Sequence, residues 1–221
     1  RHNPNIDSAA MERALASLSK EEREAVIEGK FVSFHGRVLE DPVYVQPVSP
    51  DDLAGQDVFV GIDPGIARGG VVWCAFDRDN HLLVFDELYP SGLSVPAVAE
   101  LIREKNKSWG IDEPYRYVID PSARNRSLTD GENVTGLFAR EGIYCAAGQN
   151  DRRTGVLQMR ARIEAGAVTV TENCVNWKRE CRRWLVASDE VMAEQKASVK
   201  GGGGSFATIG PDHLQDPTRY V

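Results

Sequence analysis

The sequence contains one local pattern twice, a strand-like run that closes with Ile-Asp-Pro. The first run covers residues 58–63 and ends at Asp63, and the second covers residues 115–120 and ends at Asp120. Val, Ile, Phe and Tyr bounded by Pro and Gly are typical of β-strands, and the first run lacks the polar alternation of a half-exposed strand. Open α/β sheets bind ligands at the carboxyl ends of their strands. The pattern therefore predicts an α/β sheet with two carboxylates at its ligand-binding edge.

A third acidic group lies near the end of the chain. Asp212, His213 and Asp216 follow a Gly-Pro pair there, and we expect Asp212 to cap a helix that begins at this point. A carboxylate that leaves water needs a cation or hydrogen-bond donors, and hard divalent cations take oxygen ligands. Three carboxylates surrounded by Gly and Pro therefore suit a divalent metal site.

The remaining segments alternate between strand-like and helix-like patterns. A tight turn at residues 77–80 should join the second and third strands, so the first three strands form an antiparallel meander. The next helix should cross over the sheet, which makes the strand ending at Asp120 parallel to the first strand. The predicted strands are residues 58–63, 70–76, 82–89, 115–120, 143–147 and 168–171, and the predicted helices are residues 95–107, 133–141, 151–165 and 173–186.

The first quarter of the chain has a different character. Two capped helix patterns precede a polar, proline-containing segment that runs to Gln56. We expect residues 1–54 to form an N-terminal helical arm or linker outside the central sheet, and residues 55–221 to form the folded domain. A helical hairpin packed on the domain is the alternative. Four consecutive glycines at residues 201–204 predict a flexible loop.

Composition limits the possible functions. The 221 residues carry a net charge of −7, which argues against a bulk electrostatic grip on nucleic acid but leaves room for a local basic face. The sequence has no apolar run long enough for a membrane span and no signal peptide, so we expect no membrane association and no secretion. The cysteines form no CxxC pair and are expected to be free thiols: Cys74, Cys145, Cys174 and Cys181.

The predicted order of elements is similar to that of the ribonuclease H-like fold, an α/β fold whose mixed central sheet has three antiparallel strands followed by parallel strands. Within that fold the sequence resembles the C-terminal nuclease domain of tailed-bacteriophage terminase large subunits. Residues 18–23 and 29–31 resemble the segment that joins this nuclease to its ATPase. The resemblance covers nearly the whole chain and rests on residues 60–65, 118–121, 150–152, 160–166, 174–176 and, most specifically, 212–220.

Two features depart from the family pattern. Pro217 stands where the family often has Ala, so the last helix must begin late or kink because proline has no amide hydrogen. The chain also lacks the G-x-x-x-x-G-K-[ST] motif, so the packaging ATPase would lie on a missing N-terminal portion.

The resemblance implies a metal-dependent endonuclease that cuts concatemeric double-stranded DNA during genome packaging, in the cytoplasm of the infected bacterium. Asp63, Asp120 and Asp212 would be the catalytic ligands of two divalent cations, Mg²⁺ or Mn²⁺, with His213 and Asp216 as alternatives for the third ligand. The terminase ATPase domain, the small terminase subunit and the portal would be partners. The candidate DNA-binding residues are basic: Arg68, Arg152, Arg153, Arg160, Lys178 and Arg182, with Arg179 and Arg183 beside them.

Three other functions fit the sequence less well. A sugar-kinase or actin-like ATPase would need a second phosphate loop and a duplicated domain, for which the chain is too short. A junction resolvase shares the fold, but residues 212–220 argue against it. A non-catalytic domain that docks DNA or the portal is disfavoured because all three carboxylates are present.

Overall fold

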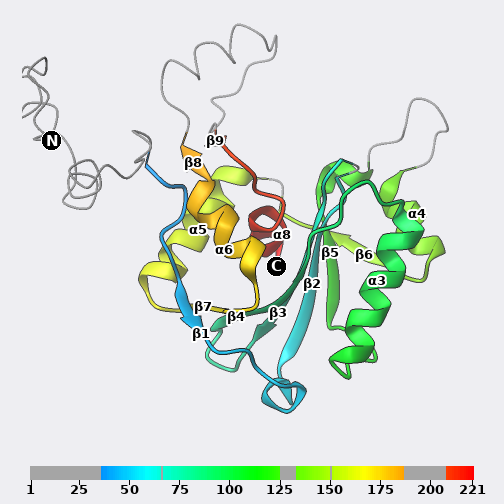
Figure 1. The fold of residues 1–221 in the computed structure, drawn as a ribbon, viewed down its shortest axis with the longest axis horizontal. Helices are drawn as coiled ribbons and strands as arrows, with labels where there is room; N and C mark the ends of the chain where they lie inside the picture. Colours follow the sequence, from blue (N-terminus) through cyan, green and yellow to red (C-terminus); the bar gives the residue numbers. More distant parts are fainter. Residues whose placement is uncertain (1–35, 66, 125–132, 150, 187–207) are drawn as a thin grey trace, which may run out of the picture. The chain divides into compact units, whose positions relative to one another are not determined.

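The computed structural model describes residues 36–65, 67–124, 133–149, 151–186 and 208–221. The predicted arm helices and the glycines at 201–204 lie outside the described residues. A compact unit spans Arg37–Val221, and its centre is a seven-stranded mixed sheet with the order β1-β7-β4-β3-β2-β5-β6 (Figure 1). The strands are β1 (Val43–Val45), β2 (Asp57–Asp63), β3 (Gly70–Phe76), β4 (Leu82–Leu88), β5 (Arg116–Ile119), β6 (Cys145–Ala147) and β7 (Val168–Thr171).

Strand directions follow the sequence prediction. The strands β2, β3 and β4 form the antiparallel meander, and β5 lies parallel to β2. The Asp77 carboxylate accepts the amides of Asp79 and His81, and Asn80 takes a positive φ of 61°, a conformation that Asn tolerates better than most residues. This local bonding stabilises the tight turn between β3 and β4.

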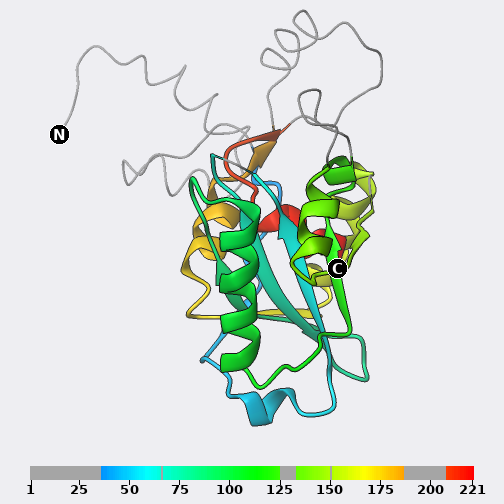
Figure 2. The ribbon, with the colours of Figure 1, turned by 90° about the vertical axis from the view of Figure 1, so that its right-hand side faces the viewer.

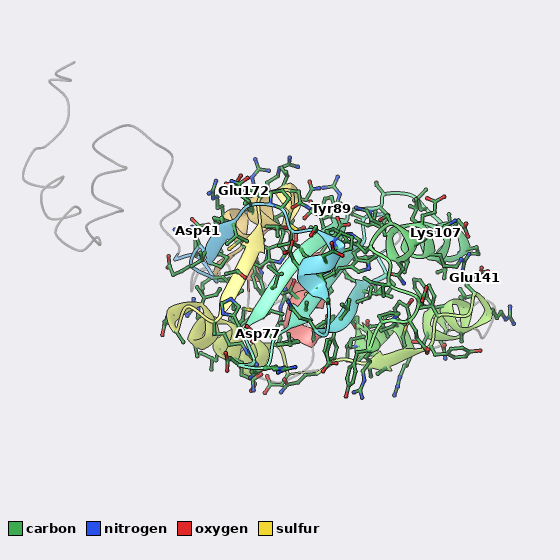
Figure 3. The ribbon with its side chains drawn as sticks, turned by 90° about the horizontal axis from the view of Figure 1, so that it is seen from below. Asp41, Asp77, Tyr89, Lys107, Glu141 and Glu172 are labelled. Atoms are coloured by element: carbon green, nitrogen blue, oxygen red, sulfur yellow. The ribbon has the colours of Figure 1, made fainter. Side chains whose placement is uncertain are left out.

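Helices cover both faces of the sheet, which explains the absence of polar alternation in its central strands. In β3, Val71 and Trp73 belong to the core beneath one helical layer, while Val72 and Cys74 belong to the core beneath the other. Figure 2 shows the first layer toward the viewer, and Figure 3 shows the sheet between the two layers. The first layer contains α3 (Val95–Ser108) and α4 (Val134–Arg140), and the second contains α5 (Arg152–Glu164), α6 (Val175–Arg183) and α8 (Gln215–Tyr220).

Short elements complete the fold. The predicted last long helix is shorter than expected because Trp184 leaves helical geometry, and the next two residues pair as a strand with a late segment. The short elements are η1 (Pro50–Leu53), η2 (Pro121–Arg124), β8 (Leu185–Val186) and β9 (Thr208–Ile209). None of the described helices has the length and apolarity that crossing a membrane requires. The four cysteines are free thiols, as predicted.

Two expectations are wrong. Val43–Val45 is not outside the sheet: it pairs in parallel with β7 as an edge strand, and the preceding Val38 and Leu39 are buried. The strand has only three residues within a polar segment, so its pattern is too short to recognise. Asp212 is also not a helix cap, because α8 begins at Gln215. Pro217 then lies in the first turn of α8, where amides have no intrahelical acceptor, which agrees with the predicted late start.

Candidate active site

The carboxylates of Asp63 and Asp120 come from the ends of two neighbouring strands. Parallel pairing places Ile62 opposite Ile119, so the next residues are Asp63 at the end of β2 and Asp120 just beyond β5. Neighbouring strands lie about 4.8 Å apart. The amide of Asp120 donates to the carbonyl of Ile62 at 3.2 Å, which continues the ladder to this point. The predicted pair of carboxylates at one sheet edge is confirmed.

Asp63 lies within an acidic group. Burial raises the pKa of its carboxyl, and the nearby carboxylates of Asp216 and Asp120 raise it further, against an opposing effect of His213. His213 Nδ1 lies 2.8 Å from Asp63 Oδ2, and this hydrogen bond raises the pKa of the imidazole. His213 is therefore bonded to Asp63, and the charges of Asp120 and Asp216 act on the same carboxyl.

Hydrogen-bond donors hold Asp120 in its ionised form. The Tyr220 hydroxyl donates to Oδ2 at 2.5 Å, and the Ser122 amide donates to Oδ1 at 2.6 Å. Burial alone would raise the pKa of Asp120, but these donors stabilise the anion and the pKa lies below its usual value. Asp120 therefore presents an oriented, ionised carboxylate at neutral pH.

Arginines neutralise the two acids of the closing segment, which we define as residues 212–216. Asp212 pairs with Arg152. Asp216 accepts a hydrogen bond from Arg219 Nε at 2.8 Å, and Arg152 Nε lies 3.8 Å from the same carboxylate. The charge of Asp216 contributes to the raised pKa of Asp63, whereas Asp212 is paired with Arg152.

Three glycines allow the C-terminal chain to lie directly against the face of the sheet. A Cβ at Gly61 in β2 would lie 2.5 Å from the Pro217 carbonyl oxygen, and one at Gly148 would lie 2.6 Å from Tyr220 Cβ. A Cβ at Gly70 would overlap the backbone of His213. Any side chain at these positions would displace the segment that carries the third acidic group.

The donor chemistry fits a hard divalent cation. In the part of the chain that is described, no three His, Cys, Asp or Glu side chains already converge on one ion position. Burial is the main cause of the raised pKa of Asp63, and the negative charges of Asp216 and Asp120 add to it. A cation among these carboxylates would relieve their repulsion.

Comparison with known proteins identifies the architecture. No family model and no curated protein matches the sequence. The P22 large terminase nuclease domain has a TM-score of 0.63 and 16% identity, with coverage of 84% of this chain and 90% of that chain. The bacteriophage SPP1 nuclease domain with bound Mn has a TM-score of 0.57 and 16% identity, with coverage of 84% and 97%. The chain has the fold of a phage large-terminase nuclease domain.

The ribonuclease H-like fold class predicted from the order of elements is thereby confirmed. A longer large terminase from a thermophilic bacteriophage is similar over 99% of this chain, with a TM-score of 0.61 and 17% identity. This chain spans only 52% of that longer chain. The ends of β2 and β5 are adjacent because the two strands pair in parallel, and α8 packs against both strands.

Of the predicted DNA-binding residues, only some lie near this site. Arg68 is exposed and its guanidinium stacks over the ring of Tyr89 at 5.3 Å. Arg152 lies at the closing segment, bound to Asp212. Arg160 instead donates to the backbone carbonyls of residues 37 and 38, at 3.0 and 2.5 Å, so it holds the entry to β1. The side chain of Arg153 lies outside the described set.

Lys178 and Arg182 lie near the edge of the sheet that β1 forms. They lie over the ring of Tyr44 in β1, at 4.8 and 6.0 Å, and Arg182 also bonds to Asp41 at 3.4 Å. Four strand spacings separate β1 from β2, which is about 19 Å. The neighbouring Arg179 and Arg183 are exposed on the same helix. This group therefore forms a surface apart from the carboxylates.

Sequence reasoning missed Tyr89 and Glu180. Glu180 is buried and joins Tyr89 to the backbone of the closing segment. A signal was present: Trp177, Glu180, Cys181 and Trp184 recur at helical spacing and are all buried, so a carboxylate sits within the apolar stripe of α6. The many basic residues of α6 made the helix resemble a solvated surface, so this buried carboxylate was not recognised.

Proposed function

We propose that this chain is the nuclease domain of a phage large terminase, a metal-dependent endonuclease that cleaves double-stranded DNA concatemers during genome packaging. One observation carries the proposal: Asp63 and Asp120 lie side by side at the ends of β2 and β5, with the closing segment against them. The similarity to the nuclease domains of the P22 and SPP1 large terminases supports it.

Asp63 and Asp120 would hold two divalent cations, Mg²⁺ or Mn²⁺, together with a third ligand from the closing segment. Such cations supply hydroxide from bound water and stabilise the leaving oxygen of a phosphodiester. Asp212 is our preferred third ligand, and it would exchange Arg152 for the cation. His213, bonded to Asp63, and Asp216, which acts on Asp63 electrostatically, are the alternatives.

The protein's own groups prepare the site and bind DNA. Tyr220 and Ser122 keep Asp120 ionised and oriented, so this ligand needs little rearrangement. Arg68 is exposed and lies over the Tyr89 ring, which neighbours His213, and it would neutralise a backbone phosphate of the substrate. Contacts to phosphates carry no sequence information directly, which fits cleavage with little sequence preference.

The proposed context is a packaging motor in the cytoplasm of an infected bacterium. The similar large terminase from a thermophilic bacteriophage is about twice as long as the matched region, and one of its structures contains ADP. We therefore propose that an ATPase domain accompanies this nuclease in the full protein. The small terminase subunit and the portal are proposed partners by the same family resemblance.

Plasmid cleavage tests the function. Wild-type chain should cut with Mn²⁺ or Mg²⁺ and lose activity in EDTA, and Asp63→Asn or Asp120→Asn should abolish cutting. Asp57→Asn is the matched control, because Asp57 is exposed at the opposite end of β2. Cleavage by Asp63→Asn at the wild-type rate would contradict the assignment. Absence of wild-type cleavage with every metal, with and without the ATPase portion, would favour the non-catalytic docking role.

Calorimetric titration with Mn²⁺ identifies the third ligand. Asp212→Asn, His213→Ala and Asp216→Asn should differ in affinity, and the true ligand should show the largest loss. We expect this to be Asp212→Asn. A wild-type affinity for Asp212→Asn together with a large loss in either other variant would move the assignment to that residue.

A further inference from the structure

A buried carboxylate that is not part of the acidic group, that of Glu180, contacts the closing segment. Glu180 in α6 is only 1% exposed. Its Oε2 accepts the amide of Leu214 at 2.7 Å, and its Oε1 accepts the hydroxyl of Tyr89 at 2.5 Å. Burying a carboxylate is costly unless donors satisfy it, and burial raises the pKa of Glu180. Its donors are neutral groups, namely the Leu214 amide, the Tyr89 hydroxyl and the backbone of Gln215.

The first donor fixes the backbone of the closing segment. Leu214 is fully buried and lies between His213 and the first residue of α8. Farther along, Gln215 Nε2 donates to the Trp177 carbonyl at 2.9 Å, and Trp177 Nε1 donates to Thr218 Oγ1 at 2.9 Å. One face of α6 thus holds the closing segment and α8, and Glu180 provides the contact nearest to His213.

The second donor links Glu180 to two candidate functional side chains. The Tyr89 ring centroid lies 6.1 Å from that of His213, and the Arg68 guanidinium lies 5.3 Å from the same Tyr89 ring. Tyr89 follows the end of β4 (Figure 3) and is only half-buried. The bond from its hydroxyl to Glu180 restricts where the ring can lie. A metal-ligand candidate and a phosphate-binding candidate therefore share one aromatic support.

We propose that Glu180 is a positioning residue of the nuclease site, which holds the closing segment through Leu214 and orients His213 and Arg68 through Tyr89. The inference rests on the proposed function. It does not depend on which member of the closing segment is the third ligand, because Glu180 holds the backbone that carries all three candidates.

Two substitutions of Glu180 separate its geometry from its charge. In Glu180→Gln the amide oxygen can accept the Leu214 amide, and the amide nitrogen can donate to the Tyr89 hydroxyl. In Glu180→Leu both partners lose their bond. Groups that orient metal ligands typically contribute 10–100-fold to metal affinity or activity. We expect Glu180→Leu to weaken Mn²⁺ binding in calorimetry and to lower kcat by about 10–100-fold, and Glu180→Gln to restore most of both.

Asn106→Leu is the matched control for lost stability. Asn106 is also buried, at 6% exposure, and bonds to Trp73 and Tyr117 beneath the other helical layer. The Asn106→Leu substitution should lower the melting temperature without changing Mn²⁺ affinity. Tyr89→Phe is a milder test because it removes only one hydroxyl. We expect this variant to bind Mn²⁺ about tenfold more weakly, with the melting temperature nearly unchanged.

Several results would overturn the inference. Wild-type Mn²⁺ affinity and kcat in Glu180→Leu, or in Tyr89→Phe if the leucine variant does not fold, would leave Glu180 a purely structural role. An equal loss in Glu180→Gln and Glu180→Leu would show that charge matters rather than hydrogen-bond geometry. If the wild-type chain neither binds Mn²⁺ nor cleaves DNA, the proposed function fails as well, whereas the first two results leave it intact.

Discussion

Replacing Gly61 by alanine should damage the candidate active site although Gly61 itself has no chemical role. The added Cβ would lie 2.5 Å from the Pro217 carbonyl oxygen and 2.9 Å from its carbonyl carbon. Both neighbours are backbone atoms of α8, so no side-chain rotation can relieve the overlap. To reach the 3.4 Å of ordinary contact, α8 must move away from β2 by about 0.9 Å. Asp216 precedes Pro217 in α8 and would move with it.

This displacement sets the expected magnitudes. Overpacking a filled site costs about 1–3 kcal/mol. For a chain of this size that lowers the melting temperature by roughly 2–12 °C. A misplacement of about 1 Å at a catalytic group costs on the order of 100-fold in rate. We therefore expect Gly61→Ala to fold, to melt at a lower temperature and to cleave plasmid about 100-fold more slowly with Mn²⁺.

The assay compares melting temperature and the initial rate of plasmid cleavage in the same preparations. Gly36→Ala is the control, because a Cβ there meets no described atom within 4 Å and φ is not in the left-handed region. It should match the wild type in both measurements. Wild-type rate and melting temperature in Gly61→Ala would refute the argument, because the packing of α8 on β2 would then not be tight. A lowered melting temperature with an unchanged rate would show that the position of α8 does not govern catalysis.

Individual contacts give three further predictions. Arg160→Ala should lower stability by about 1–3 kcal/mol in denaturant titration without changing DNA affinity, because its guanidinium bonds to backbone carbonyls; a weaker affinity would contradict this. Arg68→Ala should weaken DNA binding measured by fluorescence anisotropy and leave the melting temperature unchanged. The dependence of the binding constant on salt concentration should fall by the equivalent of about one phosphate contact. The half-buried Glu87 carboxylate accepts hydrogen bonds from the amides of Asn176 and Trp177 at the start of α6, and its partial burial raises its pKa. The folded chain thus binds more protons than the unfolded chain between the ordinary pKa of 4.5 and the raised value. The stability of the wild type relative to Glu87→Gln should therefore decrease as pH rises through that window, and denaturant titrations showing an increase would refute the sign.

The central part of the fold could be predicted from the sequence because local patterns there are long and consistent. Strands such as β2 and β3 are apolar on both faces, and the Asp77 turn between β3 and β4 leaves one way to connect them. The edge strand β1 could not be predicted in this way. It has three residues in a polar segment, and its place depends on pairing with β7, more than 120 residues later.

The sequence by itself determined that Asp63 and Asp120 lie at one edge of an α/β sheet, because each ends an apolar strand and the crossover makes these strands parallel. Only the tertiary structure decided which partners the other charged side chains take. Asp212 pairs with Arg152, Arg160 bonds to the chain before β1, and Glu180 holds Leu214, all across separations that no local pattern encodes. A strand pattern is governed by neighbours two residues apart, whereas the partner of a charged side chain is chosen by packing after distant segments meet.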